Sequence, residues 1–137
     1  MLFRSNCDLI INPNSLNRKD DMLLLNEVLS IIKEGYADPG FDVNQIIVKV
    51  GMSRSVFYKK FQSISSQSAN NILKNFRLNK AAELLSSGQC SVSQAAYDCG
   101  FSDPAYFSKL FKERFNTPPK SYILQECKYD KQMIHHH

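Results

Sequence analysis

The sequence predicts an all-α protein, and three observations support this prediction. Apolar residues recur at helical spacing over most of the 137 residues, and nowhere do they alternate with the period of a β-strand. Helix-start signals recur too: Asp42 precedes Gln45, and Ser91 precedes Gln94, the pattern of a capping box. The segment 43–53 also recurs at 92–102, and such a repeat is typical of proteins built from repeated helical units.

The first elements are a lead-in and one amphipathic helix. Residues 1–19 mix apolar side chains with Asn, Pro and Ser, and we expect a linker there. Asn17 is the expected cap of the helix that follows, whose apolar residues fall at i, i+3, i+4 and i+7: Leu25, Val28, Leu29 and Ile32. We expect Gly35 to end this helix in the left-handed conformation, before a turn at 38–40.

From Asp42 onward every segment is predicted to be helical. The expected helices cover 43–50, from Ser53 to about 62, 66–86, 92–99, from Ser102 to about 115, and from 117–119 to about 126. Ser53 and Ser102 are the expected N-caps of their helices, and Gly51, Gly88 and Gly100 mark the breaks. Residues 125–137 are expected to be a tail.

An internal repeat organises these helices. With a shift of 49 positions, VNQIIVKVGMS (43–53) aligns with VSQAAYDCGFS (92–102), and with a shift of 50, Phe57, Lys59 and Phe61 align with Phe107, Lys109 and Phe111. Each copy has a short helix, a turn with Gly and a second helix, which is the layout of a helix-turn-helix. The sequence therefore predicts two helix-turn-helix subdomains, 43–62 and 92–115, joined by a long linking helix, about seven helices in all.

The second helix of each repeat has one apolar and one polar face. Phe57 and Phe61 are expected to point inward, opposite Ser55, Tyr58, Lys59 and Gln62; Phe107 and Phe111 are expected inward, opposite Ala105, Ser108, Lys109 and Lys112. Neither outward face contains an acid, and these side-chain types can enter a major groove. A linking helix of about 21 residues would be about 31 Å long. This is close to the ~34 Å helical turn of B-DNA, so we expect double-stranded DNA bound in adjacent major grooves.

The net charge, the histidines and the cysteines exclude several classes of function. The formal charge of +4 combines a net −3 over residues 1–42 with +7 over 43–137, which favours a polyanionic partner for the later part. The three histidines, His135–His137, resemble a tag remnant, and without them His-dependent catalysis and His-containing zinc sites are excluded. Four cysteines without a CxxC pair are expected to be free thiols in a reducing, cytoplasmic setting. No cofactor, metal or membrane contact is expected, and the chain is not expected to be an enzyme.

These residues resemble the DNA-binding domain of the AraC/XylS family over about 25–124. The strongest part is SVSQAAYDCGFSDPAYFSKLFKERFNTPPKSY (91–122), with VNQIIVKVGMSRSVFYKKF (43–61) and FRLNKAAELL (76–85) matching the first motif and the linking helix. The resemblance implies an AraC-type DNA-binding domain over 20–124. The base or groove contacts that it implies are Arg54, Ser55, Tyr58 and Lys59 in the first motif, and Pro104, Ala105, Ser108 and Lys109 in the second. As N-caps, Ser53 and Ser102 are expected to present backbone N–H groups to DNA phosphates. Lys60 and Lys112 are expected to contact phosphates, with solvated surface lysines as the alternative. Lys120 is a further expected phosphate contact.

GMSRS followed by YKKF, behind an acidic helix, is most similar to the C-terminal output domain of hybrid two-component regulators. Stand-alone response regulators have similar domains. The resemblance implies a phosphorelay upstream, with a kinase in the full-length chain, dimerisation through missing domains, possible contact with RNA polymerase, and control of carbohydrate-use genes.

Two alternatives stay open at this point. The chain could be a helical protein-interaction or dimerisation module without DNA specificity of its own, and the salt dependence of binding separates the two functions. The seven phenylalanines from Phe57 to Phe115 could line a ligand site, but their helical spacing favours a shared core.

Overall fold

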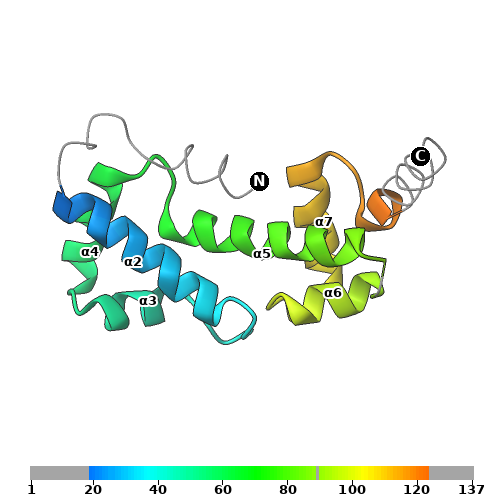
Figure 1. Ribbon diagram of the computed structural model, residues 1–137, viewed down its shortest axis with the longest axis horizontal. Helices are drawn as coiled ribbons and strands as arrows, with labels where there is room; N and C mark the ends of the chain where they lie inside the picture. Colours follow the sequence, from blue (N-terminus) through cyan, green and yellow to red (C-terminus); the bar gives the residue numbers. More distant parts are fainter. Residues whose placement is uncertain (1–18, 89, 124–137) are drawn as a thin grey trace, which may run out of the picture. The chain divides into compact units, whose positions relative to one another are not determined.

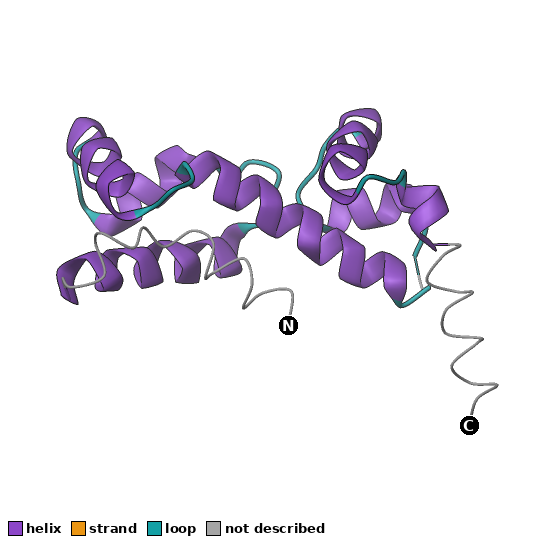
Figure 2. Cartoon of the chain, turned by 90° about the horizontal axis from the view of Figure 1, so that it is seen from above, coloured by secondary structure: helices purple, strands orange, loops and turns teal. Residues whose placement is uncertain are grey.

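The computed structural model describes residues 19–88 and 90–123, and its regular elements there are helices. Six of them are α2 (Lys19–Gly35), α3 (Val43–Val50), α4 (Arg54–Ile64), α5 (Ala69–Ser86), α6 (Val92–Asp98) and α7 (Pro104–Phe115), and a last helical turn covers 119–123 (Figure 1). Figure 2 shows no strand in this part of the chain. The all-α prediction is therefore confirmed. The Asn17 cap, the 1–18 part of the lead-in and the tail lie outside the described residues.

The described residues divide into two compact units, with the boundary inside α5 between Phe76 and Arg77. The first unit contains α2, α3, α4 and the start of α5; the second contains the rest of α5, α6, α7 and the last helical turn. Loop residues 37–39 group with the second unit, and the Arg77 Nη2 group donates a hydrogen bond to the Asp38 carbonyl at 3.0 Å.

In the first unit α2 packs against α3 and α4 (Figure 1). The predicted apolar side of α2 is confirmed, since Leu25, Val28 and Ile32 are buried and Leu29 is half-buried. The core of this unit also includes Phe41, Val43, Ile46, Ile47, Phe57, Phe61, Ile64, Ala69, Ile72, Leu73 and Phe76. Burial of this surface stabilises the unit and holds α4 against α2 and α3.

In the second unit several of the buried residues are small. Ala81 and Ala82 of α5 and Ala95 and Ala96 of α6 are all buried. Other buried apolar residues of this unit are Leu78, Leu85, Cys99, Phe101, Phe107, Leu110 and Phe111. Burial raises the pKa of the Cys99 thiol to about 12, and nearby Asp98 adds to the shift, so this thiol is protonated at neutral pH.

Both helix-turn-helix turns use glycine in the left-handed conformation, as predicted. Gly51 ends α3 with a φ of 76°, and its N–H donates to the carbonyls of Ile47 and Val48 at 3.1 Å. Gly100 follows α6 with a φ of 90°. A residue with a Cβ would be strained at either position. The linking helix α5 begins at Ala69, later than the predicted 66, because the Ser68 hydroxyl accepts a hydrogen bond from the Asn71 N–H at 3.1 Å.

The prediction for Gly35 was wrong. Gly35 is the last residue of α2 and is not among the described residues with a positive φ. Its role is steric, because a Cβ built on it would lie 2.5 Å from Cδ1 and 2.6 Å from Cε1 of Phe41. Phe41 is only 4% exposed, so its ring has little space to move away. Glycine here allows the loop after α2 to close onto the helix.

The Gly35→Ala variant tests this role, because the change in stability has opposite signs at an uncrowded helical position and at a position crowded by Phe41. Gly→Ala within an uncrowded helix stabilises by about 0.5–1 kcal/mol. We expect Gly35→Ala instead to lower the free energy of unfolding by about 1–3 kcal/mol through overpacking against Phe41. Urea unfolding measures this change, and the loss should shrink when Phe41→Leu is already present. A Gly35→Ala variant more stable than the wild type would contradict the account.

Candidate nucleic-acid interface

The second helix of the first helix-turn-helix is α4, and its burial pattern follows the prediction. The Ser53 hydroxyl caps it by accepting a hydrogen bond from the Val56 N–H at 3.4 Å. Phe57 and Phe61 are 0% and 2% exposed, and their rings stack with centroids 5.4 Å apart. The predicted outward residues are all exposed: Ser55, Tyr58, Lys59 and Gln62. α4 extends to Ile64, two residues beyond its predicted end.

Arg54, the first residue of α4, is exposed and contacts two neighbours. Its Nη1 group donates a hydrogen bond to Oδ1 of Asn44 in α3, and its guanidinium carbon lies 5.6 Å from the centroid of the Tyr58 ring. The structure therefore brings two of the predicted site residues, Arg54 and Tyr58, into contact. Asn44 was not predicted, because only the packing of α3 beside α4 shows that the two side chains meet.

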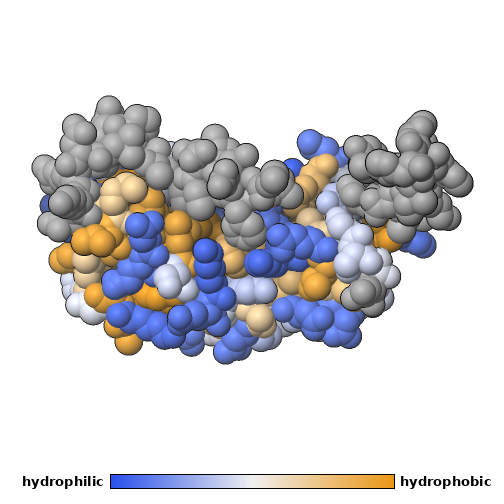
Figure 3. All heavy atoms as spheres, in the orientation of Figure 1, coloured by the Kyte–Doolittle hydropathy of each residue, from blue (hydrophilic) through white to orange (hydrophobic). Residues whose placement is uncertain are grey.

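Lys60 lies on a different side of α4 from the outward face. It is half-buried and lines a shallow hollow of about 410 Å³ with Leu23, Leu24 and Glu27 of α2 and with Met52. On the face seen in Figure 3, hydrophobic residues reach the surface of the first unit between hydrophilic ones. The structure thus separates Lys60 from Ser55 and Lys59, although the sequence placed all three in one site.

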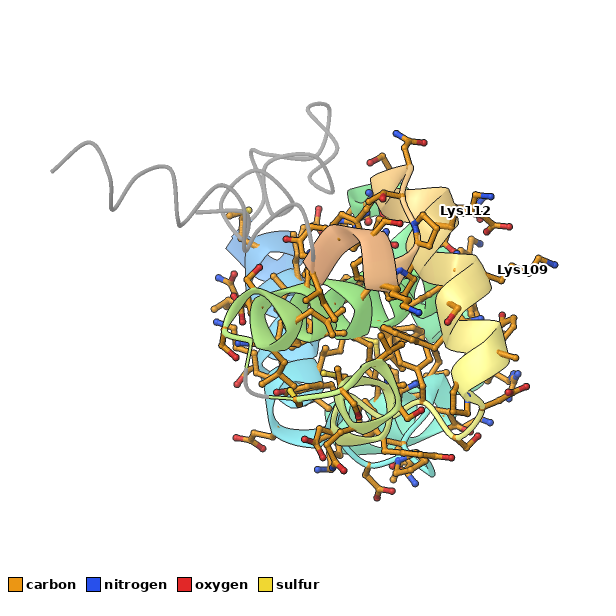
Figure 4. The ribbon with its side chains drawn as sticks, turned by 90° about the vertical axis from the view of Figure 1, so that its right-hand side faces the viewer. Lys109 and Lys112 are labelled. Carbon is orange, nitrogen blue, oxygen red and sulfur yellow. The ribbon has the colours of Figure 1, made fainter. Side chains whose placement is uncertain are left out.

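The second helix of the other helix-turn-helix is α7, which repeats this pattern. Phe107 and Phe111 are both 0% exposed, with ring centroids 5.6 Å apart. Of the predicted outward residues, Ala105, Lys109 and Lys112 are exposed and Ser108 is half-buried; Pro104, at the helix start, is also half-buried. Figure 4 shows Lys109 and Lys112 pointing away from the ribbon.

The predicted N-cap of α7 was wrong. The cap is Asp103, whose Oδ1 accepts a hydrogen bond from the Ala105 N–H at 3.0 Å, and Pro104 takes the first helical position. Ser102 lies one residue before the cap and is exposed. A carboxylate at the helix start is favoured by the helix dipole. The Asp103 carboxylate lies at the helix start, where Ser102 was expected to present the helix N–H groups to a phosphate. Ser102 therefore does not have the N-cap position on which that expected role depended.

Exposed apolar side chains at repeat-equivalent positions were missed by the sequence analysis. Val56 of α4 and Tyr106 of α7 are 52% and 54% exposed, and the shift of 50 aligns them. Val48 of α3 and Tyr97 of α6 are also exposed and are aligned by the shift of 49. The repeat alignment itself was the signal that could have found them, since both copies place an apolar residue outside the buried face.

One cation of α7, Arg114, is half-buried and bonds to a residue of α5. The Arg114 Nε group donates to Oδ1 of the buried Asn79 at 3.0 Å, and burial lowers the pKa of this guanidinium. Arg114 therefore joins α7 to α5 and is not part of the outward face. Within residues 19–88 and 90–123, no group of three or more potential metal ligands occurs. No helix in that part of the chain is long and apolar enough to cross a bilayer.

Residues 46–125 match the family model described as a helix-turn-helix domain. Among solved structures, the DNA-binding domain of AdpA, determined in complex with a target DNA, has a TM-score of 0.72 and 27% identity, over 79% of this chain and 96% of that one. The chain belongs to the AraC/XylS family of helix-turn-helix regulators. It is a DNA-binding domain of a transcription regulator, as the resemblance implied.

Other proteins similar to this chain include a response regulator, a histidine kinase and a transcription activator. The C-terminal domain of the two-component response regulator yesN from Fusobacterium nucleatum has a TM-score of 0.62 and 28% identity, over 70% of this chain and 93% of that one. Histidine kinase P4 of Formosa agariphila is 33% identical over 74% of this chain. The activator RhaS of Escherichia coli is 30% identical over 82% of it. The matches span only 7% and 41% of these two curated relatives.

Proposed function

We propose that this AraC-family domain reads specific DNA sequences with the outward faces of α4 and α7. The observation that carries the proposal is that both helices bury a phenylalanine pair and expose lysine at repeat-equivalent positions, Lys59 in α4 and Lys109 in α7. The proposed contacts are Ser53, Arg54, Ser55, Tyr58 and Lys59 in the first unit, and Pro104, Ala105, Ser108, Lys109 and Lys112 in the second. The likeness to AdpA, solved with its target DNA, supports the use of such helices for DNA.

The two helices offer different chemistry to a major groove. α4 presents a guanidinium, hydroxyl groups and Lys59, which can donate hydrogen bonds to guanine edges and phosphates. The start of α7 presents Pro104 and Ala105, whose side chains have no donor and suit thymine methyl groups and groove shape. Lys109 and Lys112 follow and suit phosphates. We therefore expect the first unit to depend more on hydrogen bonds to bases than the second.

The wider context is also a proposal. The likeness to the yesN C-terminal domain and to part of a histidine kinase supports an output role in a two-component system acting on genes in the cytoplasm. Phosphorylation upstream would then pair two such domains, raise their effective concentration at adjacent sites and convert weak binding into occupancy. Contacts with RNA polymerase and a kinase in the same full-length chain belong to this proposal.

Substitution of the outward lysines tests the DNA interface. On a duplex selected from random DNA fragments, Lys59→Ala and Lys109→Ala should each weaken binding by about 1–3 kcal/mol if the lysine contacts a base. A lysine that contacts a phosphate should instead reduce the slope of log K against log salt by about 0.9. Fluorescence anisotropy over a salt series measures both quantities.

Lys60→Ala is the matched control, because it removes the same charge from the flank of the same helix. It should change the affinity less than Lys59→Ala does. Wild-type affinity in both Lys59→Ala and Lys109→Ala would contradict the proposed interface. Binding without salt dependence would favour the protein-interaction alternative.

Phosphorylation tests the two-component context separately. The full-length protein should bind its promoter more tightly when its phosphorylating signal is present, because pairing of two domains multiplies weak affinities. Promoter binding measured by footprinting with and without the signal gives the answer. Equal occupancy in both conditions would contradict this context and would leave the DNA interface itself untouched.

A further inference from the structure

The side chains around Arg54 form a connected series from the core to the surface. Phe57 is fully buried, and the Tyr58 ring lies edge-on to it, with centroids 5.7 Å apart. The Arg54 guanidinium lies 5.6 Å from the Tyr58 ring on one side and donates a hydrogen bond to Asn44 Oδ1 on another. Asn44 belongs to α3, so the side chain at the start of α4 is held by two helices.

Holding an arginine in this way matters for recognition. A guanidinium has five N–H donors in a planar arrangement, and one of its nitrogens bonds Asn44 here. Ordering a flexible side chain at an interface costs about 0.5–1.5 kcal/mol, and a side chain that is already ordered avoids part of this cost. A fixed plane also favours the bidentate geometry with which arginine recognises guanine.

The second unit has no equivalent arrangement. The repeat aligns Asn44 with Ser93 and Arg54 with Pro104, so neither the acceptor amide nor the guanidinium is present there. In the second unit the Gln94 Nε2 group instead donates a hydrogen bond to Asp98 Oδ1 at 2.8 Å, and both residues belong to α6. The Asn44–Arg54 pair is therefore specific to the first unit.

We propose that Asn44 is a positioning residue that orients Arg54 for direct recognition of one base pair by the first unit. The proposal rests on the DNA-binding function proposed above and deepens it. Asn44 acts through Arg54 and does not itself touch DNA. The first unit then supplies sequence preference at a base pair where the second unit, with Pro104 at the equivalent position, has none.

The test is a double-mutant cycle on the selected duplex and on its single-base-pair variants. Asn44→Ala should weaken binding by about threefold to tenfold, the loss expected when one side chain must be ordered on binding. It should also lose preference at the same base pair as Arg54→Ala, with an unchanged salt slope because no charge is removed. In the Arg54→Ala background, Asn44→Ala should have no further effect. Ser93→Ala, at the equivalent position of the second unit, should match the wild type.

The Asn44→Asp variant separates positioning from a merely structural role. It keeps an oxygen acceptor for Arg54, so the base-pair preference should remain even where added negative charge lowers the affinity. Both Asn44 and Arg54 are exposed, so thermal unfolding should change little in these variants. Full base-pair preference in Asn44→Ala would overturn the proposal. So would an equal loss of affinity in the Arg54→Ala background, which would show that Asn44 contacts DNA directly. A wild-type chain that selects no sequence would overturn the proposed function as well.

Discussion

The orientation of each recognition helix depends on two buried phenylalanines that lie one helical turn apart. Phe57 and Phe61 hold α4, and Phe107 and Phe111 hold α7. Burial of one such side chain is worth about 1.5–3 kcal/mol, so a rotation that hid the polar face would expose both rings at a large cost. The polar face is therefore directed outward by the core, whether or not DNA is bound. The predicted recognition surface follows from this constraint.

The sequence predicted the features that depend on spacing alone. Helical periodicity places Phe57 and Phe61 on one side of α4 whatever its neighbours are, and the repeat then places Phe107 and Phe111 in the same way. The left-handed Gly51 and Gly100 were predictable because a tight turn between two helices requires a positive φ. The family resemblance added the link from these faces to DNA.

Features that depend on which side chains meet in space could not be predicted in this way. Gly35 accommodates the Phe41 ring, a contact that a turn signal does not reveal. Ser and Asp are equally good caps, so the choice of Ser102 was wrong, and only the backbone shows that Asp103 caps α7. The glutamine of each predicted capping box bonds elsewhere, Gln45 to the Gly40 carbonyl and Gln94 to Asp98. The Asn44–Arg54 contact likewise depends on how α3 packs beside α4.

The central claim is that two equivalent helix faces both approach DNA. Photo-crosslinking from Ser55 and Ala105, which the repeat aligns and which are both exposed, tests it most directly. With a photoreactive amino acid at either position, the account predicts efficient crosslinks to bases of the selected duplex, in one segment for residue 55 and in a separate segment for residue 105. Crosslinks from only one of the two positions, or from neither, would contradict it.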